Sequence, residues 1–225
     1  MGDIDINSEG NQISKKKKRI MIYFIEATEK LMEEEGIDSL SIRKIATVAG
    51  YNSATLYNYF EDLDHLILFA SIRHLKKYVV DLYNSIKKEM DALETYRVIY
   101  RKFSEAAFTS PEIFYNMFFG HYSSKLSQVL RQYYELFPDE LGEHKGFIRS
   151  MLNEGNIYQR DMTFMDALVE EGFVKAEKAA DTVQVMVRTN QSFILEACKL
   201  EDSTKIESHV EAFMKLFDYV MEAAK

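Results

Sequence analysis

The sequence predicts an all-α protein of about nine helices. Apolar residues recur at three- and four-residue spacings along almost all of its 225 residues, as on one face of a helix. The alternation of apolar and polar residues that is typical of strands is nearly absent. Only two prolines and nine glycines occur, and because both residues break helices, their scarcity leaves room for many long ones.

The first predicted helix covers Lys16–Glu35, and Gly36 is suited to end it. Residues 61–90 contain neither Gly nor Pro and are expected to form one helix of about 45 Å, which connects two regions. A loop is expected at Pro138–Gly146. Further helices are expected at Ala92–Thr109, from Pro111, at Ser123–Phe137, from about Phe147 to Gly155, up to Gly172, at Lys178–Lys199 and at Thr204–Ala224.

Composition places the chain among globular proteins, with 47% hydrophobic and 28% charged residues. The acidic opening, within an expected disordered tail of residues 1–14, lacks the basic and apolar regions of a signal peptide. The single cysteine, Cys198, is expected to be a small buried hydrophobe. The longest obvious apolar run is Leu66–Ala70, too short for a membrane span. These features predict a cytoplasmic protein without a membrane anchor.

Charge is distributed unevenly around the net value of −8. Residues 11–60 hold eight Lys or Arg against six acidic residues, whereas residues 61–225 hold 20 basic and 27 acidic residues. The acidic region would repel a polyanion. Any nucleic acid is therefore expected to bind through the N-terminal segment.

Residues 41–60 have the layout of a helix-turn-helix. Ser41 can cap a short helix whose inner face carries Ile45, Ala46 and Ala49, and Gly50 supplies the turn. Asn52 or Ser53 can cap the second helix, with Leu56 and Phe60 facing the core. The residues expected to face outward carry no negative charge that would oppose phosphate: Ser53, Ala54, Thr55, Tyr57 and Asn58. An ordinary helical hairpin explains the same spacing equally well.

Residues 19–66, about a fifth of the chain, resemble the DNA-binding domain of the TetR (tetracycline repressor) family. The resemblance rests on Ser41-Ile-Arg-Lys-Ile-Ala46, then Ala49-Gly50, then Thr55-Leu-Tyr-Asn-Tyr-Phe60. It implies that Ser41 and Tyr57 hold phosphates, that Thr55 and Tyr59 lie at the DNA backbone, and that Arg43 reaches a base or a phosphate. It also implies that four residues meet the groove floor: Tyr51, Asn52, Ser53 and Ala54.

The sequence departs from the family after Phe60, where a lysine common in the family is replaced by Glu61-Asp62-Leu63-Asp64. That phosphate contact is therefore expected to be missing. A basic run near the N-terminus can replace it as an arm on the DNA backbone or in the minor groove, or is simply a solvated helix start: Lys15, Lys16, Lys17, Lys18 and Arg19.

The central region concentrates aromatic residues and methionines, which form either plain core or the wall of a cavity for a hydrophobic or aromatic ligand. Three polar residues, His121, Tyr158 and Asn190, are candidates for the few polar contacts of such a pocket. The other candidate pocket residues are apolar or aromatic: Phe103, Met117, Phe118, Tyr122, Met151, Met162, Met165 and Met186.

The last helix carries a heptad pattern in Ile206, Val210, Phe213, Phe217, Val220 and Ala224. Further apolar residues beyond this seam suggest a partner subunit, and the resemblance implies a four-helix bundle between two subunits. The candidate interface residues lie on the last two helices: Ala179, Val183, Ala197, Val210, Phe213, Phe217, Val220 and Met221.

Catalytic and metal-binding patterns are poorly represented. The five histidines are scattered, no Glu-x-x-His pair occurs, and no Gly-rich phosphate loop is present. We therefore predict neither an enzyme nor a bound cofactor.

The sequence thus favours a homodimeric transcriptional regulator, a repressor released from a double-stranded DNA operator by a small-molecule effector. Residues 15–62 would form its DNA-binding domain and residues 63–225 its ligand-binding and dimerisation domain. Two alternatives remain: a helical carrier or sensor of hydrophobic molecules that has lost DNA binding, and a protein-interaction adaptor.

Overall fold

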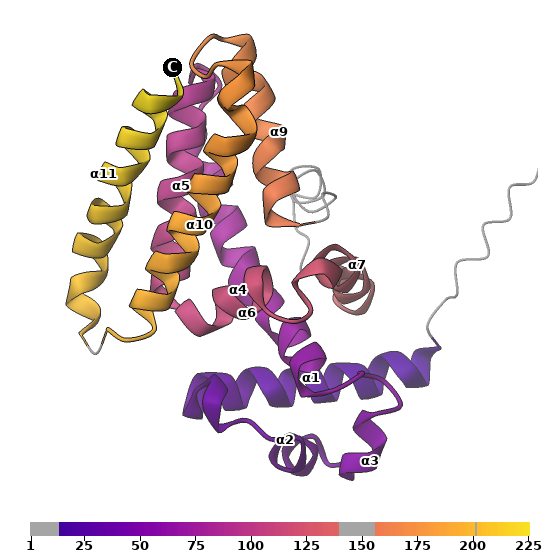
Figure 1. Ribbon diagram of the computed structural model, residues 1–225. Coiled ribbons are helices and arrows are strands. Elements are labelled where there is room, and N and C mark those ends of the chain that lie inside the picture. Colours follow the sequence, from indigo (N-terminus) through magenta and orange to yellow (C-terminus); the bar gives the residue numbers. More distant parts are fainter. Residues whose placement is uncertain (1–13, 140–155, 201) are drawn as a thin grey trace, which may run out of the picture. The chain divides into compact units, whose positions relative to one another are not determined.

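The computed structural model describes residues 14–139, 156–200 and 202–225. Within these ranges the chain forms ten α-helices, joined by turns and short 3-10 segments, and no strand (Figure 1). The all-α prediction is confirmed. The chain divides after Leu66 into two compact units.

The N-terminal unit contains α1 (Lys15–Glu35), α2 (Ile42–Ala49) and α3 (Ser53–Leu56), with a 3-10 turn at Ile37–Ser39 between the first two. Ser14 caps α1, since its Oγ accepts a hydrogen bond from Lys17 N at 3.3 Å. Gly50 ends α2 in the left-handed region at φ +76°, which a residue with a Cβ rarely adopts.

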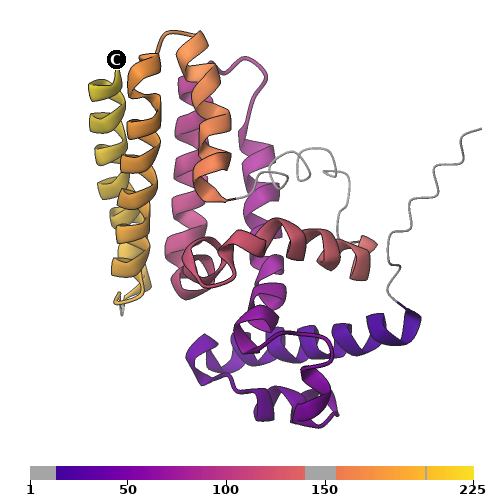
Figure 2. The same ribbon diagram turned by 45° about the vertical axis from the view of Figure 1, so that its right-hand side comes forward.

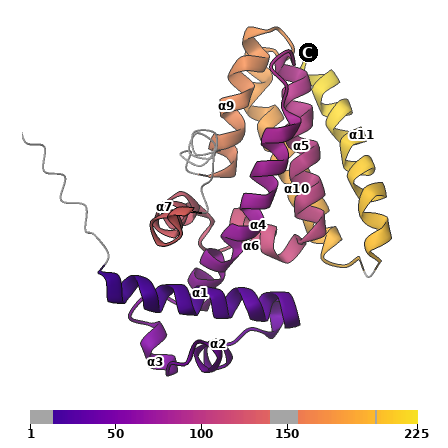
Figure 3. The same cartoon turned by 180° about the vertical axis from the view of Figure 1, so that it is seen from behind.

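The C-terminal unit holds the remaining helices. They are α4 (Leu63–Ser85, entering from the first unit), α5 (Ala92–Thr109), α6 (Pro111–Phe119), α7 (Leu126–Leu136), α9 (Ile157–Glu170), α10 (Ala179–Ala197) and α11 (Ile206–Ala224). Short 3-10 turns lie at Ser123–Lys125, Ala176–Lys178 and Ser203–Lys205. Helix α10 packs against α5, α6, α9 and α11, and α11 also packs against α5 (Figures 1 and 2). The same bundle is seen from behind in Figure 3.

The predicted helix over residues 61–90 is shorter than expected, because α4 ends at Ser85. Asp91 is the reason that a new helix begins so soon. Its Oδ1 accepts a hydrogen bond from Glu94 N at 2.7 Å while Glu94 Oε2 accepts one from Asp91 N, which forms a capping box for α5. The intervening residues form a turn, with Met90 N donating to the carbonyl oxygen of Lys87.

The second helix of the predicted helix-turn-helix is also shorter than expected. Only Ser53–Leu56 is α-helical, and the next turns are held by hydrogen bonds from Asn58 N to Thr55 O and from Tyr59 N to Leu56 O. Cys198 is half-buried at the end of α10, not fully buried. The predicted tail, except for Ser14, and the predicted helix at 147–155 lie outside the described residues, as does most of the loop at 138–146.

Candidate functional site

The helix-turn-helix of the N-terminal unit is held together by a small apolar core. Ile45 and Leu56 are completely buried, Ala46 is 1% exposed and Phe60 is 2% exposed. Phe24 of α1 joins this core, with its ring 6.3 Å from that of Phe60. These contacts fix α2 and α3 against α1 and leave the opposite side of α3 open to solvent.

Most residues predicted to contact DNA lie on this open side. Tyr57 is 57% exposed, even though its side chain is large and partly apolar. The other exposed members are Ser41, Arg43, Asn52, Ala54 and Asn58, and the half-buried members are Tyr51, Ser53, Thr55 and Tyr59.

Two of these residues have structural contacts that sequence reasoning did not anticipate in detail. Asn52 Oδ1 accepts hydrogen bonds from both N and Oγ1 of Thr55, each at 2.9 Å, and thereby caps α3. The ring of Tyr51 packs on Phe24 at 5.5 Å between centroids. Ser53, Ala54, Tyr57 and Asn58 are therefore less constrained than Asn52 and Tyr51.

The basic run lies in the first turns of α1 and is helical, so in this structure it is not an extended arm. Lys18 is half-buried, and the guanidinium of Arg19 lies 6.0 Å from the ring centroid of Tyr23. The exposed members are Lys15, Lys16, Lys17 and Arg19.

The acidic segment after Phe60 has a structural explanation. Asp62 Oδ1 accepts a hydrogen bond from His65 N at 2.9 Å, and His65 Nδ1 accepts one from Glu61 N at 3.1 Å. The exchange is similar to a capping box and starts α4. Replacing Asp62 would remove the acceptor that starts the helix.

The C-terminal unit contains a mainly apolar cavity of about 70 Å³. Five aromatic residues contribute to its wall, together with the polar residues Arg160, Asp161 and Asn190. The complete lining is Leu75, Tyr78, Ile99, Tyr100, Phe103, Phe118, Ile157, Arg160, Asp161, Phe164, Val187 and Asn190.

Asp161 on α9 is 7% exposed and is the central group of a buried network. Its Oδ2 accepts hydrogen bonds from the hydroxyl groups of Tyr100 at 2.8 Å and Tyr96 at 3.0 Å. Burial raises the pKa of Asp161 to about 7, because desolvation disfavours the charged carboxylate more than the two tyrosine hydrogen bonds favour it. Burial also raises the pKa of both tyrosines, so they remain donors.

The cavity includes some of the residues predicted for a ligand pocket and leaves out others. Phe103, Phe118 and Asn190 line it. Met117, Met165 and Met186 are completely buried elsewhere in the core, and Tyr122 is 5% exposed outside the cavity. His121, expected to be buried, is exposed. Tyr158 and Met162 line a separate open hollow between α9 and α10, and Met151 lies outside the described residues.

Residues predicted to face a partner subunit instead fill the core of a single chain. Phe213 and Phe217 are 0% and 1% exposed, and their rings lie 5.8 and 5.6 Å from that of Tyr100. Val220 is half-buried. The other buried members are Ala179, Val183, Ala197, Val210 and Met221. The assignment of this seam to an interface is thereby corrected, because both a core and a dimer contact require an apolar heptad.

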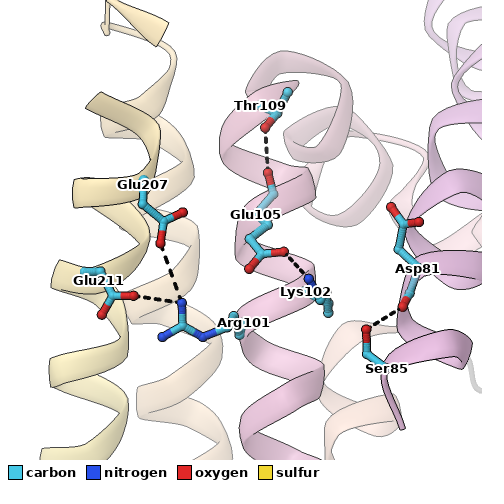
Figure 4. Close-up of polar contacts among 8 residues, drawn as sticks. All are labelled: Asp81, Ser85, Arg101, Lys102, Glu105, Thr109, Glu207 and Glu211. Carbon is cyan, nitrogen blue, oxygen red and sulfur yellow. Dashed lines mark hydrogen bonds and ion pairs between the residues drawn. The ribbon is translucent and has the colours of Figure 1, made fainter. Parts of the chain in front are cut away.

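Ion pairs cover a different face of α11. Arg101 of α5 contacts Glu211 at 2.8 Å and Glu207 at 3.8 Å (Figure 4). Arg97 pairs with Asp218. These pairs lie beside the α5–α11 contact and occupy that edge of α11.

A third face of α11 is apolar and exposed. It comprises Ala212, Leu216, Tyr219 and Ala223, at steps of four, three and four residues, and we call it the outer stripe. Leu216 is 43% exposed and Tyr219 is 74% exposed. On α10, Val185 and Leu195 are exposed at 47% and 43%. Each residue of the outer stripe directly precedes a residue of the predicted heptad seam, namely Phe213, Phe217, Val220 and Ala224.

Sequence reasoning missed the network of Asp161, Tyr96 and Tyr100. One signal was present: Asp161 precedes Met165 and Leu168 by four and seven residues, so a carboxylate stands on the buried face of α9. Its partners Tyr96 and Tyr100 are likewise one helical turn apart on α5.

Two further properties concern the described part of the chain. It contains no group of three or more His, Cys, Asp or Glu side chains arranged to hold a metal ion. None of its helices is long and apolar enough to span a membrane.

The geometry of the N-terminal unit, a short helix with one open side behind a glycine turn, is that of a helix-turn-helix, a motif typical of DNA-binding proteins. The sequence profile of the bacterial regulatory proteins of the tetR family matches residues 24–68. An HTH-type transcriptional regulator of Staphylococcus aureus strain USA300 is 26% identical over 133 residues, covering 56% of this chain and 72% of the relative.

Solved structures share the fold. RolR in complex with resorcinol has a TM-score of 0.58 at 17% identity, covering 94% of this chain and 95% of RolR. Thermus thermophilus FadR, a TetR-family repressor in complex with lauroyl-CoA, has a TM-score of 0.53 at 14% identity, covering 87% of this chain and 92% of FadR. Residues 24–68 are thus similar to the DNA-binding domain of the tetR family of bacterial regulatory proteins, and the chain shares its all-α fold with RolR and FadR.

Proposed function

We propose that the protein is a repressor that binds a palindromic operator as a homodimer and leaves it when a small apolar or aromatic molecule binds the C-terminal unit. The observation that carries the proposal is the apolar cavity, present in the same chain as an exposed helix-turn-helix. RolR binds resorcinol and FadR binds lauroyl-CoA. A cavity of about 70 Å³ suits an effector closer to resorcinol in size.

The outer stripe of α11 supports the homodimer. Leu216 and Tyr219 expose apolar surface that the described part of the chain does not cover, and the ion pairs of Arg97 and Arg101 occupy the edge toward α5. A two-fold axis would bring two copies of the stripe together as a self-complementary contact. The two recognition helices would then meet major-groove faces about 34 Å apart or somewhat more.

Selection of DNA from a random pool by the purified full-length chain tests this function. We expect an enriched palindrome with two related half-sites. Ala54→Glu should abolish enrichment, because it places a negative charge on the exposed side of α3. Ala167→Glu, the same change on an exposed position of α9, is the matched control and should leave enrichment intact. No enrichment at low salt would contradict DNA binding.

Release by an effector has its own test. Once a ligand is known, saturating amounts should lower operator affinity by about 5- to 150-fold, and operator should weaken ligand binding by the same factor. Leu75 and Tyr78, which line the cavity, belong to α4, the helix that follows the helix-turn-helix. Unchanged ligand affinity in the presence of saturating operator would rule out release by this route.

A further inference from the structure

Asn190 on α10 has a buried acceptor without a hydrogen bond. The side chain is 1% exposed, and its Nδ2 donates to Ser104 Oγ of α5 at 3.0 Å. Among the described residues, no donor meets its Oδ1. Buried carbonyl oxygens in proteins are nearly always paired. Because Asn190 is one of the residues that line the cavity, its unpaired oxygen is suited to a donor that arrives with a ligand.

The charged residues of the same cavity indicate the charge of that ligand. Arg160 lines the wall, so its guanidinium would repel a cationic ligand, and an anionic ligand would lose its hydration in a wall that is otherwise largely apolar or aromatic. The remaining wall is apolar or aromatic and includes the rings of Tyr78, Phe103, Phe118 and Phe164. This surrounding favours a neutral and largely apolar molecule.

The volume limits its size. A cavity of roughly 150 Å³ accommodates benzene in an engineered protein, and the cavity here measures about 70 Å³. One ring therefore enters only with a small shift of the wall, for which the half-buried Phe164 is the least enclosed aromatic member. A long acyl chain does not fit this space.

We propose that the cavity binds a neutral molecule made of a single aromatic ring with a hydroxyl group, and that the hydroxyl donates a hydrogen bond to Asn190 Oδ1. The proposal rests on the proposed function, because it specifies the effector of the same C-terminal unit. It makes Asn190 the residue that distinguishes a hydroxylated ring from a plain one.

Calorimetric titration of the full-length chain with three probes tests the proposal. Phenol carries a donor, toluene has the same shape without one, and benzaldehyde carries only an acceptor. We expect phenol to bind at least about tenfold more tightly than either of the others, because only phenol satisfies the buried acceptor. Equal affinities, a preference for benzaldehyde, or no binding of any probe would each overturn the assignment.

Two variants locate the effect. Asn190→Leu should remove the preference for phenol over toluene, whereas Asn84→Leu, the same change at an exposed position near the end of α4, should retain it. A preference that survives in a folded Asn190→Leu variant would overturn the role of Asn190. The comparison of probes on the unmodified chain needs no variant, so it decides the proposal even if Asn190→Leu fails to fold.

The selection of DNA from a random pool separates this proposal from the proposed function. An enriched operator together with equal affinities for phenol and toluene would leave the regulator and remove the hydroxyl assignment. A preference for phenol in a chain that enriches no DNA would leave the ligand site and remove the regulator.

Discussion

The helix-turn-helix of the N-terminal unit presents polar side chains to solvent, whereas the C-terminal unit encloses polar groups among aromatic rings. Ser41, Asn52 and Asn58 are exposed, while Asp161 and Asn190 are 7% and 1% exposed. A polyanion as large as DNA is met by an exposed surface. A small neutral molecule is recognised by a few buried polar groups in an apolar wall. The two units therefore respond to mutation in different ways.

Adjacent residues of α11 provide the largest expected contrast. Phe217→Asp places a carboxylate in the aromatic core and should lower the free energy of unfolding by about 3–5 kcal/mol. Leu216→Asp, on the outer stripe, should leave the fold of the single chain intact but separate the subunits, with operator affinity lower by about 100-fold or more.

Circular dichroism during urea unfolding and light scattering distinguish these outcomes. A Leu216→Asp protein that remains dimeric would place the interface away from the outer stripe. A Phe217→Asp protein that is stably folded and monomeric would restore the buried seam to the interface.

The buried carboxyl group of the C-terminal unit predicts a pH dependence of stability. Folded, Asp161 keeps its proton up to about pH 7, whereas in the unfolded chain it ionises near its ordinary pKa of 3.8. The free energy of the unfolded state therefore falls relative to that of the folded state as pH rises between these values. Stability should fall across this window, by up to about 4 kcal/mol, and change little above pH 7.

Asp161→Asn isolates this contribution from those of other carboxyl groups. The amide oxygen can still accept hydrogen bonds from Tyr96 and Tyr100 but does not titrate. The difference in unfolding free energy between the two proteins, measured in urea at pH 5 and pH 8, should change in favour of the variant at the higher pH. A difference independent of pH would show that Asp161 is ionised in both states at pH 5.

A smaller effect is expected on the exposed surface of the N-terminal unit. Tyr57→Phe should weaken binding to all DNA sequences alike, by about 0.5–1.5 kcal/mol, if its hydroxyl holds a phosphate. Ser53→Ala should instead change the preferred bases. Asn52 is a poor probe of base contact, because its replacement also removes the cap of α3. Affinities across a panel of altered operators check both results, and equal effects of the two substitutions on every operator would contradict the assignment.

Local signals made part of the structure predictable from the sequence. Helix α5 has the predicted bounds of Ala92–Thr109, and Pro111 occupies the first turn of α6 as expected, since capping and proline act over a few residues. The helix-turn-helix was recognisable for the same reason. The end of α4 was missed although Asp91 and Glu94 carry a capping signature, because the absence of Gly and Pro favours continuation of a helix.

Long-range pairing set the limit of prediction. The heptad of α11 was correctly predicted to be an apolar seam, but a pattern along one helix does not say whether Phe213 and Phe217 meet α5 of the same chain or a second subunit. The cavity likewise depends on which residues of α4, α5, α6, α9 and α10 come together. Asn190 was among the predicted polar contacts, but its unpaired oxygen becomes visible only once Ser104 is placed beside it.

The basic start of α1 gives the smallest expected effect and tests whether the N-terminal unit uses surface outside its helix-turn-helix. Replacing Lys15, Lys16 and Lys17 with Gln should lower the slope of log affinity against log salt by about one for each phosphate that these lysines neutralise. Lys87 and Lys88, exposed in the turn after α4, provide a control whose replacement should leave the slope unchanged. An equal slope in the triple variant and in the control would make the basic run a solvated helix start, and DNA binding would then depend on α2 and α3 alone.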